Sequence, residues 1–184
     1  HGRKVAALIT DMDKPLGYNI GNSLEVAESM AVLQGKGPVD LTEVCLQLAS
    51  NMLVLAGKGD MLTCRKLAES VIADGTAFEK CCRMFAAQGG DISVLKDADK
   101  FRKAKYSYEL TAQADGYIYK NDVEKIGNAS VLLGAGRIKK GDSIDFAAGI
   151  TMHKKLGDYV KAGESICTFY ADDESLFDAA EEMY

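Results

Sequence analysis

Apolar residues in the first half of the chain recur with the spacings of one strand and four helices. The continuous apolar run from Val5 to Thr10 is typical of a strand buried on both faces of a parallel sheet. Amphipathic patterns follow over residues 22–33, 40–55, 63–73 and 76–87, and a glycine comes after each of them. The pattern therefore predicts a fragment of an α/β domain, with one parallel-type strand plus four helices.

Two of these helices begin with a polar side chain three residues before a glutamate. Asn22 precedes Glu25, and Asp40 precedes Glu43. This spacing predicts a capping box at both helix starts, in which the two side chains bond each other's backbone amides.

The second half follows a charged stretch and has a mainly β pattern. Residues 96–105 contain few large aliphatic side chains and are predicted to be a linker. Strand patterns follow at residues 106–111, 116–119, 144–150 and 165–171, with helices at 122–133 and 174–183. Gly134 to Arg137 is interpreted as a helix stop followed by a strand. We expect two domains, 1–95 and 106–184, and the second is predicted to be α+β.

Composition narrows the class of protein. A net charge of −5 leaves no basic surplus for nucleic acid, and no apolar run is long enough to suggest a membrane span. Five cysteines, an odd number without paired zinc-site spacing, indicate reduced thiols of a cytoplasmic protein, most of them buried as small apolar groups. The start at His1, without an initiator methionine, suggests a piece of a longer protein.

Catalytic patterns are missing from the sequence. Of the two histidines, His1 is terminal and His153 has no partner nearby in the sequence, so His153 is interpreted as a hydrogen-bonded surface or edge histidine. No phosphate-binding Walker loop, nucleophile elbow or zinc motif is present.

The densest motif runs from Leu8 to Glu28. A turn-rich loop exposes backbone carbonyls, and the next helix presents Glu25 and Glu28 one turn apart. Carbonyls and a carboxylate suit a hard cation. The alternative is that both glutamates are solvated and simply favoured by the helix dipole.

This motif, ITDMDKPLGYNIGNSLEVAE, resembles the signature of thymidine and pyrimidine-nucleoside phosphorylases. The resemblance continues through four later segments and so covers essentially the whole chain. These segments are Asp40 to Glu43, Ala86 to Asp91, Leu132 to Arg137, and Gly157 to Glu164.

The resemblance implies a homodimeric enzyme in which phosphate attacks C1′ of a pyrimidine nucleoside and releases the free base and a pentose 1-phosphate. The family's phosphate loop and base-contacting residues lie N-terminal to this chain. We therefore assign no catalytic residue here and expect the isolated chain to be inactive.

The resemblance also implies a monovalent-cation site, with K⁺ as the ion. By motif, two backbone carbonyls fall on Leu16 and Asn19, and the carboxylate falls on Glu28. The remaining ligands belong to the phosphate loop, so the site is expected to be incomplete in this chain.

The second domain is similar to the family's C-terminal α/β hammerhead domain, which also resembles biotinyl and lipoyl carriers. A carrier role would place the modified lysine at Lys120, but the residues around it lack the usual pattern. A purely structural assembly module is a further alternative. In isolation, the Val5 to Thr10 strand is expected to associate through its unpaired edge.

Overall fold

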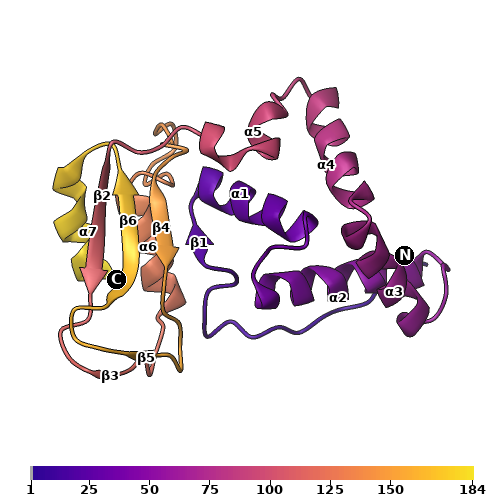
Figure 1. The fold of residues 1–184 in the computed structure, drawn as a ribbon, viewed down its shortest axis with the longest axis horizontal. Helices are drawn as coiled ribbons and strands as arrows, with labels where there is room; N and C mark the ends of the chain where they lie inside the picture. The colour runs from indigo at the N-terminus through magenta and orange to yellow at the C-terminus, as the bar shows by residue number, and fades with distance from the viewer. Residues whose placement is uncertain (1) are drawn as a thin grey trace. The chain divides into compact units, whose positions relative to one another are not determined.

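The computed structural model describes residues 2–184, which form two compact units. The first unit contains residues 2–11 and Glu28–Lys96, and the second contains Met12–Ala27 and Asp97–Tyr184. Helix α1 (Asn22–Leu33) crosses the boundary, so its first turns belong to the second unit (Figure 1).

The first unit is helical, and its helices lie close to the predicted positions. After α1 come α2 (Val39–Leu55), α3 (Met61–Ala73), α4 (Thr76–Ala87) and the short α5 (Ser93–Lys96). Helix α3 packs against both α2 and α4. Gly57 and Gly75, which follow α2 and α3, have positive φ angles of 72° and 81°, a conformation that glycine adopts without strain.

The predicted capping boxes do not form as expected. Helix α2 follows Pro38 and has no side-chain cap, because the proline side chain has no oxygen that could accept from the first amides of the helix. At α1 the Glu25 carboxylate does accept from the amide of Gly21 at 3.1 Å. The Asn22 side chain instead donates to the carbonyl of Ala135 at 2.9 Å.

The predicted parallel-type strand at Val5 to Thr10 is wrong. These residues have no regular secondary structure, and the Val5 and Ile9 side chains are 83% and 97% exposed. A strand buried on both faces requires parallel neighbours, whereas the strand pairs within residues 2–184 are all antiparallel.

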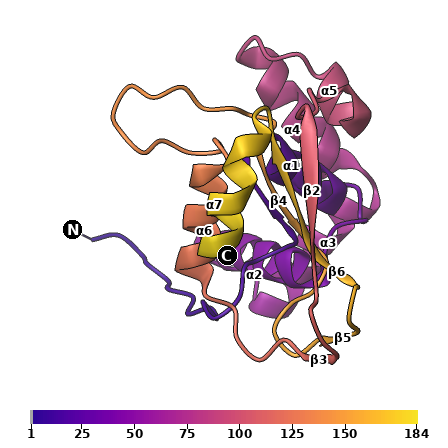
Figure 2. The same ribbon diagram turned by 90° about the vertical axis from the view of Figure 1, so that its left-hand side faces the viewer.

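The second unit contains a four-stranded antiparallel sheet in the order β1-β4-β6-β2. These strands are β1 (Asn19–Ile20), β2 (Tyr106–Thr111), β4 (Gly149–Met152) and β6 (Ser165–Ala171). Helices α6 (Val123–Leu132) and α7 (Phe177–Met183) lie side by side on one face of the sheet (Figure 2). Their apolar side chains and those of β4 and β6 form the core, which includes Ile126, Leu133, Ile150, Met152, Phe169 and Phe177.

The remaining elements of this unit are short. Strands β3 (Gly116–Tyr117) and β5 (Tyr159–Val160) form a second small sheet. Two 3₁₀ turns, η1 (Ala98–Lys100) and η2 (Glu174–Leu176), precede β2 and α7.

The strand predicted after Gly134 is absent, and the one predicted at 144–150 starts only at Gly149. The Asp145 carboxylate accepts from the amide of Ala147 at 2.9 Å, which holds this segment in a turn. The mixture of helices and strands in this unit agrees with the prediction.

Candidate functional site

The signature loop, defined here as residues 12–23, lies within the second unit and leads into β1 and α1. Gly17 turns the chain with φ 70°, in the left-handed region that favours glycine. The carbonyl of Pro15, two residues earlier, accepts a hydrogen bond from Nζ of Lys155 at 3.1 Å. The turn is therefore attached to a lysine 140 residues further along the chain.

Lys155 is nearly buried, with 8% of its surface exposed. Its ammonium lies over the ring of Tyr18, 4.3 Å from the ring centroid, which is a cation–π contact. Its backbone amide donates to the Asp158 carboxylate at 2.8 Å. Lys155 thus contacts the signature loop through both a carbonyl and an aromatic face.

The backbone of Tyr18 and Asn19 pairs with strand β4. The Met152 amide donates to the carbonyl of Tyr18 at 2.7 Å, and Asn19 is the register partner of Thr151. Hydrogen-bonded and non-bonded pairs alternate along an antiparallel ladder, so the peptide groups of Asn19 point away from β4. Because β1 is the edge strand, the Asn19 carbonyl faces the open side of the sheet.

The Asn19 side chain has a separate partner. Its Oδ1 accepts from the hydroxyl of Thr151 at 2.7 Å. This contact fixes the side chain on β4, so the backbone carbonyl is the oxygen of Asn19 best placed to bind a ligand at the sheet edge.

Two glycines allow the loop to approach β4 closely. A Cβ on Gly21 would overlap the carbonyl of Ala148, and a Cβ on Gly149 would overlap the carbonyl of Ile20. The first turn of α1 is held to the segment before β4 as well, since the Ser23 amide donates to the carbonyl of Phe146 at 3.0 Å. The signature glycine Gly21 is therefore required by this crossing.

The three predicted cation ligands belong to two different units. Leu16 and Asn19 lie on the signature loop of the second unit, whereas Glu28 belongs to the first. Glu28 is only 8% exposed, and a buried carboxylate needs polar or cationic partners. The backbone carbonyl of Asn19 and the carboxylate of Glu28 are each the type of oxygen that a hard cation binds. The K⁺ site itself stays a prediction.

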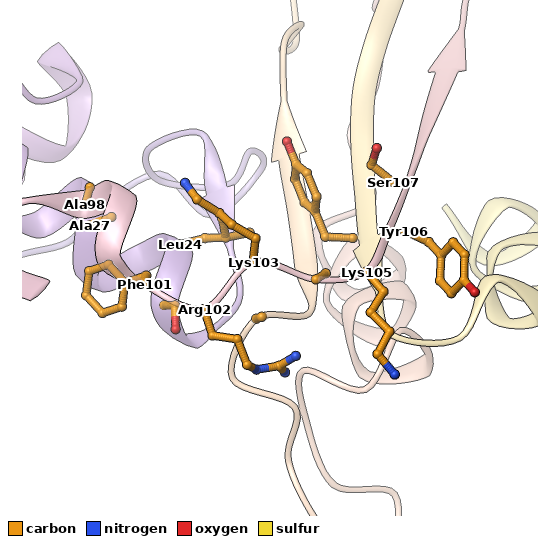
Figure 3. Close-up of a pocket in the computed structure, with 13 residues that line it drawn as sticks. Leu24, Ala27, Ala98, Phe101, Arg102, Lys103, Lys105, Tyr106 and Ser107 are labelled. Atoms are coloured by element: carbon orange, nitrogen blue, oxygen red, sulfur yellow. The ribbon is translucent and has the colours of Figure 1, made fainter.

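A cavity of roughly 300 Å³ opens elsewhere in the second unit, between the start of α1, the linker and β2. Figure 3 shows the Phe101 ring on the side of Ala27 and Ala98, with the Arg102 side chain extending away from them. Arg102 pairs with Asp145 and, at 2.7 Å, with Asp172. These ion pairs anchor the linker to the turns before β4 and after β6, so we assign Arg102 a structural role.

The other residues singled out from the sequence have structural surroundings. Nε2 of His153 is 2.8 Å from the Thr168 hydroxyl, which agrees with the interpretation of an edge histidine. Lys120 lies 3.9 Å from the carboxylate of Asp122. All five cysteines are free, and three are buried: Cys64, Cys82 and Cys167. Burial raises the pKa of the Cys167 thiol to about 12, so it is inert as a nucleophile.

Sequence reasoning missed the residues that hold the loop in place. Thr151, Lys155 and Gly149 lie more than a hundred positions from it, and nothing in the local sequence pattern indicates the pairing of β1 with β4. A β-strand of two residues is too short to give an alternating pattern.

Two kinds of feature are absent from residues 2–184. No cluster of three or more histidine, cysteine, aspartate or glutamate side chains has the arrangement of a metal site. No helix in the described part of the chain combines the length and apolarity needed to cross a bilayer.

Comparison with known proteins identifies relatives along the whole chain. Residues 117–184 match the family model described as the pyrimidine nucleoside phosphorylase C-terminal domain. All 184 residues align at 45% identity with the pyrimidine-nucleoside phosphorylase of Geobacillus stearothermophilus and at 43% with that of Bacillus subtilis (strain 168). Each alignment covers 42% of the relative, so the chain spans less than half the length of these curated relatives.

Proposed function

We propose that this chain belongs to the pyrimidine-nucleoside phosphorylase family and supplies the C-terminal portion of an enzyme that cleaves pyrimidine nucleosides with phosphate. The observation that carries the proposal is the 45% identity with the Geobacillus relative in an alignment that spans all 184 residues of the chain. In the reaction, a phosphate oxygen bonds to C1′ while the bond from C1′ to the base breaks. The products are the free base and a pentose 1-phosphate.

The contribution of this chain is to hold a loop and not to act on the substrate. None of its residues is assigned to the reacting atoms, whereas the signature loop is bonded to β4 and to Lys155 within the second unit. The proposal therefore includes inactivity of the chain by itself.

The proposal includes a K⁺ site on the signature loop. Its ligands from this chain are the carbonyls of Leu16 and Asn19 and the carboxylate of Glu28. When bound, K⁺ would supply positive charge to these oxygens and order the loop backbone. The outward direction of the Asn19 carbonyl and the burial of Glu28 support this assignment.

Assembly and location form a further part of the proposal. The first unit exposes apolar side chains from several elements, which is typical of a surface that another part of a protein covers. They include Val5, Ile9, Val39, Met52 and Leu62. We assign that cover to the remainder of the phosphorylase, in a homodimer. The free cysteines support a cytoplasmic location, and a hammerhead relationship of the second unit is likewise proposed.

The direct test is release of uracil from uridine and of thymine from thymidine in the presence of phosphate. We expect no release by this chain alone and release when it is mixed with the N-terminal portion of the Geobacillus relative. Each half alone and the mixture without phosphate are the controls. Release by this chain alone would mean that its residues include catalytic groups.

A carrier role is not favoured, because the family match is to a phosphorylase domain. Intact mass spectrometry separates the two roles. The phosphorylase proposal expects the mass of the unmodified chain, whereas a biotinyl or lipoyl adduct on Lys120 would support a carrier.

A further inference from the structure

Lys155 occupies an unusual position for a lysine. Burying an ammonium costs free energy unless hydrogen bonds and charge replace its water shell. Here the replacements include the Pro15 carbonyl at 3.1 Å and the face of the Tyr18 ring at 4.3 Å. Both belong to the signature loop, so the burial of Lys155 depends on the conformation of that loop.

Each of the two contacting residues comes directly before one of the proposed cation ligands in the sequence. Pro15 comes directly before Leu16, and Tyr18 comes directly before Asn19. A peptide unit is planar, so fixing the Pro15 carbonyl also fixes the plane from which Leu16 continues. Fixing Tyr18 likewise limits the direction of the Asn19 carbonyl.

Strand β4, which precedes Lys155, supplies other contacts to this part of the loop. Met152 donates its amide to the Tyr18 carbonyl, and Thr151 donates its hydroxyl to the Asn19 side chain at 2.7 Å. Lys155 follows β4 by three residues and extends this set of contacts to the Gly17 turn. The neighbouring Lys154 differs, because its ammonium pairs with Glu164 at 2.6 Å and bonds the Tyr159 carbonyl.

We infer that Lys155 is a positioning residue that holds the loop carbonyls of Leu16 and Asn19 in the orientation needed to bind K⁺. The inference rests on the proposed function for the cation, whereas the attachment of the loop by Lys155 can be tested without it. Lys155 acts through the loop and does not itself bind the ion.

The attachment is tested by amide hydrogen exchange on this chain. In Lys155→Met, we expect the Met152 amide, which bonds the Tyr18 carbonyl, to exchange about ten-fold faster than in the unchanged protein. The Leu133 amide, which bonds Ala129 inside the same unit, should keep its rate. Lys154→Met is the matched control and should leave the Met152 rate unchanged.

A second variant tests the same attachment if Lys155→Met does not fold. Tyr18→Leu keeps Lys155 but removes the ring beneath its ammonium, and we expect faster exchange at Met152 with Leu133 unchanged. Unchanged exchange at Met152 in both Lys155→Met and Tyr18→Leu would overturn the inference.

The link to the cation is tested in the full-length phosphorylase. K⁺ is titrated against choline at constant ionic strength, and the midpoint of thermal unfolding is followed. A purely structural lysine would lower this midpoint equally with and without K⁺. A positioning lysine would instead raise the half-saturating K⁺ concentration, by about ten-fold in Lys155→Met and not in Lys154→Met.

The outcomes are distinguishable. If the unchanged enzyme responds to K⁺ and Lys155→Met responds at the same concentration, the inference is wrong and the proposed cation site stands. If the unchanged enzyme does not respond to K⁺, the proposed cation site is wrong. The positioning of ligands for K⁺ then falls with it, and hydrogen exchange alone decides whether Lys155 attaches the loop.

Discussion

The glycine pair Gly21 and Gly149 controls how closely the signature loop approaches β4. Each residue lies where a Cβ would overlap a carbonyl of the opposite segment, and Gly149 also has a φ of 154°. A side chain at either position would force the two segments apart and weaken the pairing of β1 with β4.

We predict that Gly149→Ala lowers the free energy of unfolding by about 2–4 kcal/mol, from steric overlap and an unfavourable φ. Gly127→Ala is the matched control, because Gly127 lies in α6 with open space around its Cα. That change should raise the free energy of unfolding by about 0.5–1 kcal/mol, since alanine favours a helix over glycine. Urea unfolding of the three proteins measures both effects, and a loss at Gly149 no larger than 0.5 kcal/mol would contradict the crossing.

Tyr184 is a second residue whose substitution should change the free energy of unfolding measurably, because of its hydroxyl. Its oxygen is buried and has no hydrogen-bond partner within the described residues. The Cys167 thiol beside it is a weak hydrogen-bonding group, and burial raises the pKa of Tyr184. The ring itself packs edge-on against Phe169, with centroids 5.7 Å apart.

Removal of this hydroxyl should therefore not destabilise the core. We predict that Tyr184→Phe raises the free energy of unfolding by roughly 1 kcal/mol, because the desolvation cost of the hydroxyl disappears. Tyr184→Ala should have the opposite sign, since it removes the ring from Phe169. A loss of stability in Tyr184→Phe would show that the hydroxyl is satisfied in solution.

Helices α2 and α3 are joined by an ion-pair network on their surface. Arg65 of α3 donates to both carboxylate oxygens of Glu43 on α2, at 2.6 and 2.8 Å, and to Glu69 at 2.6 Å. The hydrogen bonds from Arg65 hold the pKa of Glu43 at about 2, below its ordinary value of 4.5.

A depressed carboxyl pKa stabilises the folded protein at neutral pH and loses this effect in acid. The contribution of Glu43 is complete above pH 4.5 and declines as the pH falls towards 2. A carbon-13 NMR titration should give a Glu43 pKa well below 4.5, and Arg65→Gln should return it towards that value. Glu69→Gln is the control and should leave the Glu43 pKa depressed. Titration of Glu43 near 4.5 in the unchanged protein would exclude the bond in solution.

Element prediction succeeded where a local signal was strong. The patterns for residues 76–87, 106–111 and 165–171 match α4, β2 and β6. Glycines and regular apolar spacing define those elements within the local sequence. Prediction failed for Val5 to Thr10, because an apolar run becomes a strand only when neighbouring strands bond it. It also failed for β1, whose two residues pair with a strand far away in the sequence.

The candidate site was predictable only in part, for the same reason. The resemblance of the motif assigned the cation ligands to Leu16, Asn19 and Glu28, which stays a prediction, and the direction of the Asn19 carbonyl is compatible with that role. The supporting residues Thr151 and Lys155 are ordinary in the sequence and acquire their roles through the fold. Local patterns carry no information on such long-range contacts.

For the whole molecule, the exposed apolar residues of the first unit have a consequence in solution. We predict that this chain associates as its concentration rises, because Val5 and Ile9 are 83% and 97% exposed. Light scattering should show a mass above that of the monomer. Changing both residues to serine should lower that mass, whereas Tyr119→Ser, at an exposed residue of the other unit, should not. A monomer at every concentration would refute this prediction.

We propose that this chain functions as the C-terminal portion of a pyrimidine-nucleoside phosphorylase. The most direct measurement uses a chimera in which these 184 residues replace the aligned 42% of the Geobacillus stearothermophilus relative. We predict that the folded chimera releases uracil from uridine only when phosphate is present, and that it forms a pentose 1-phosphate in equal amount. A chimera that folds and binds phosphate but releases no base from uridine or thymidine would contradict it.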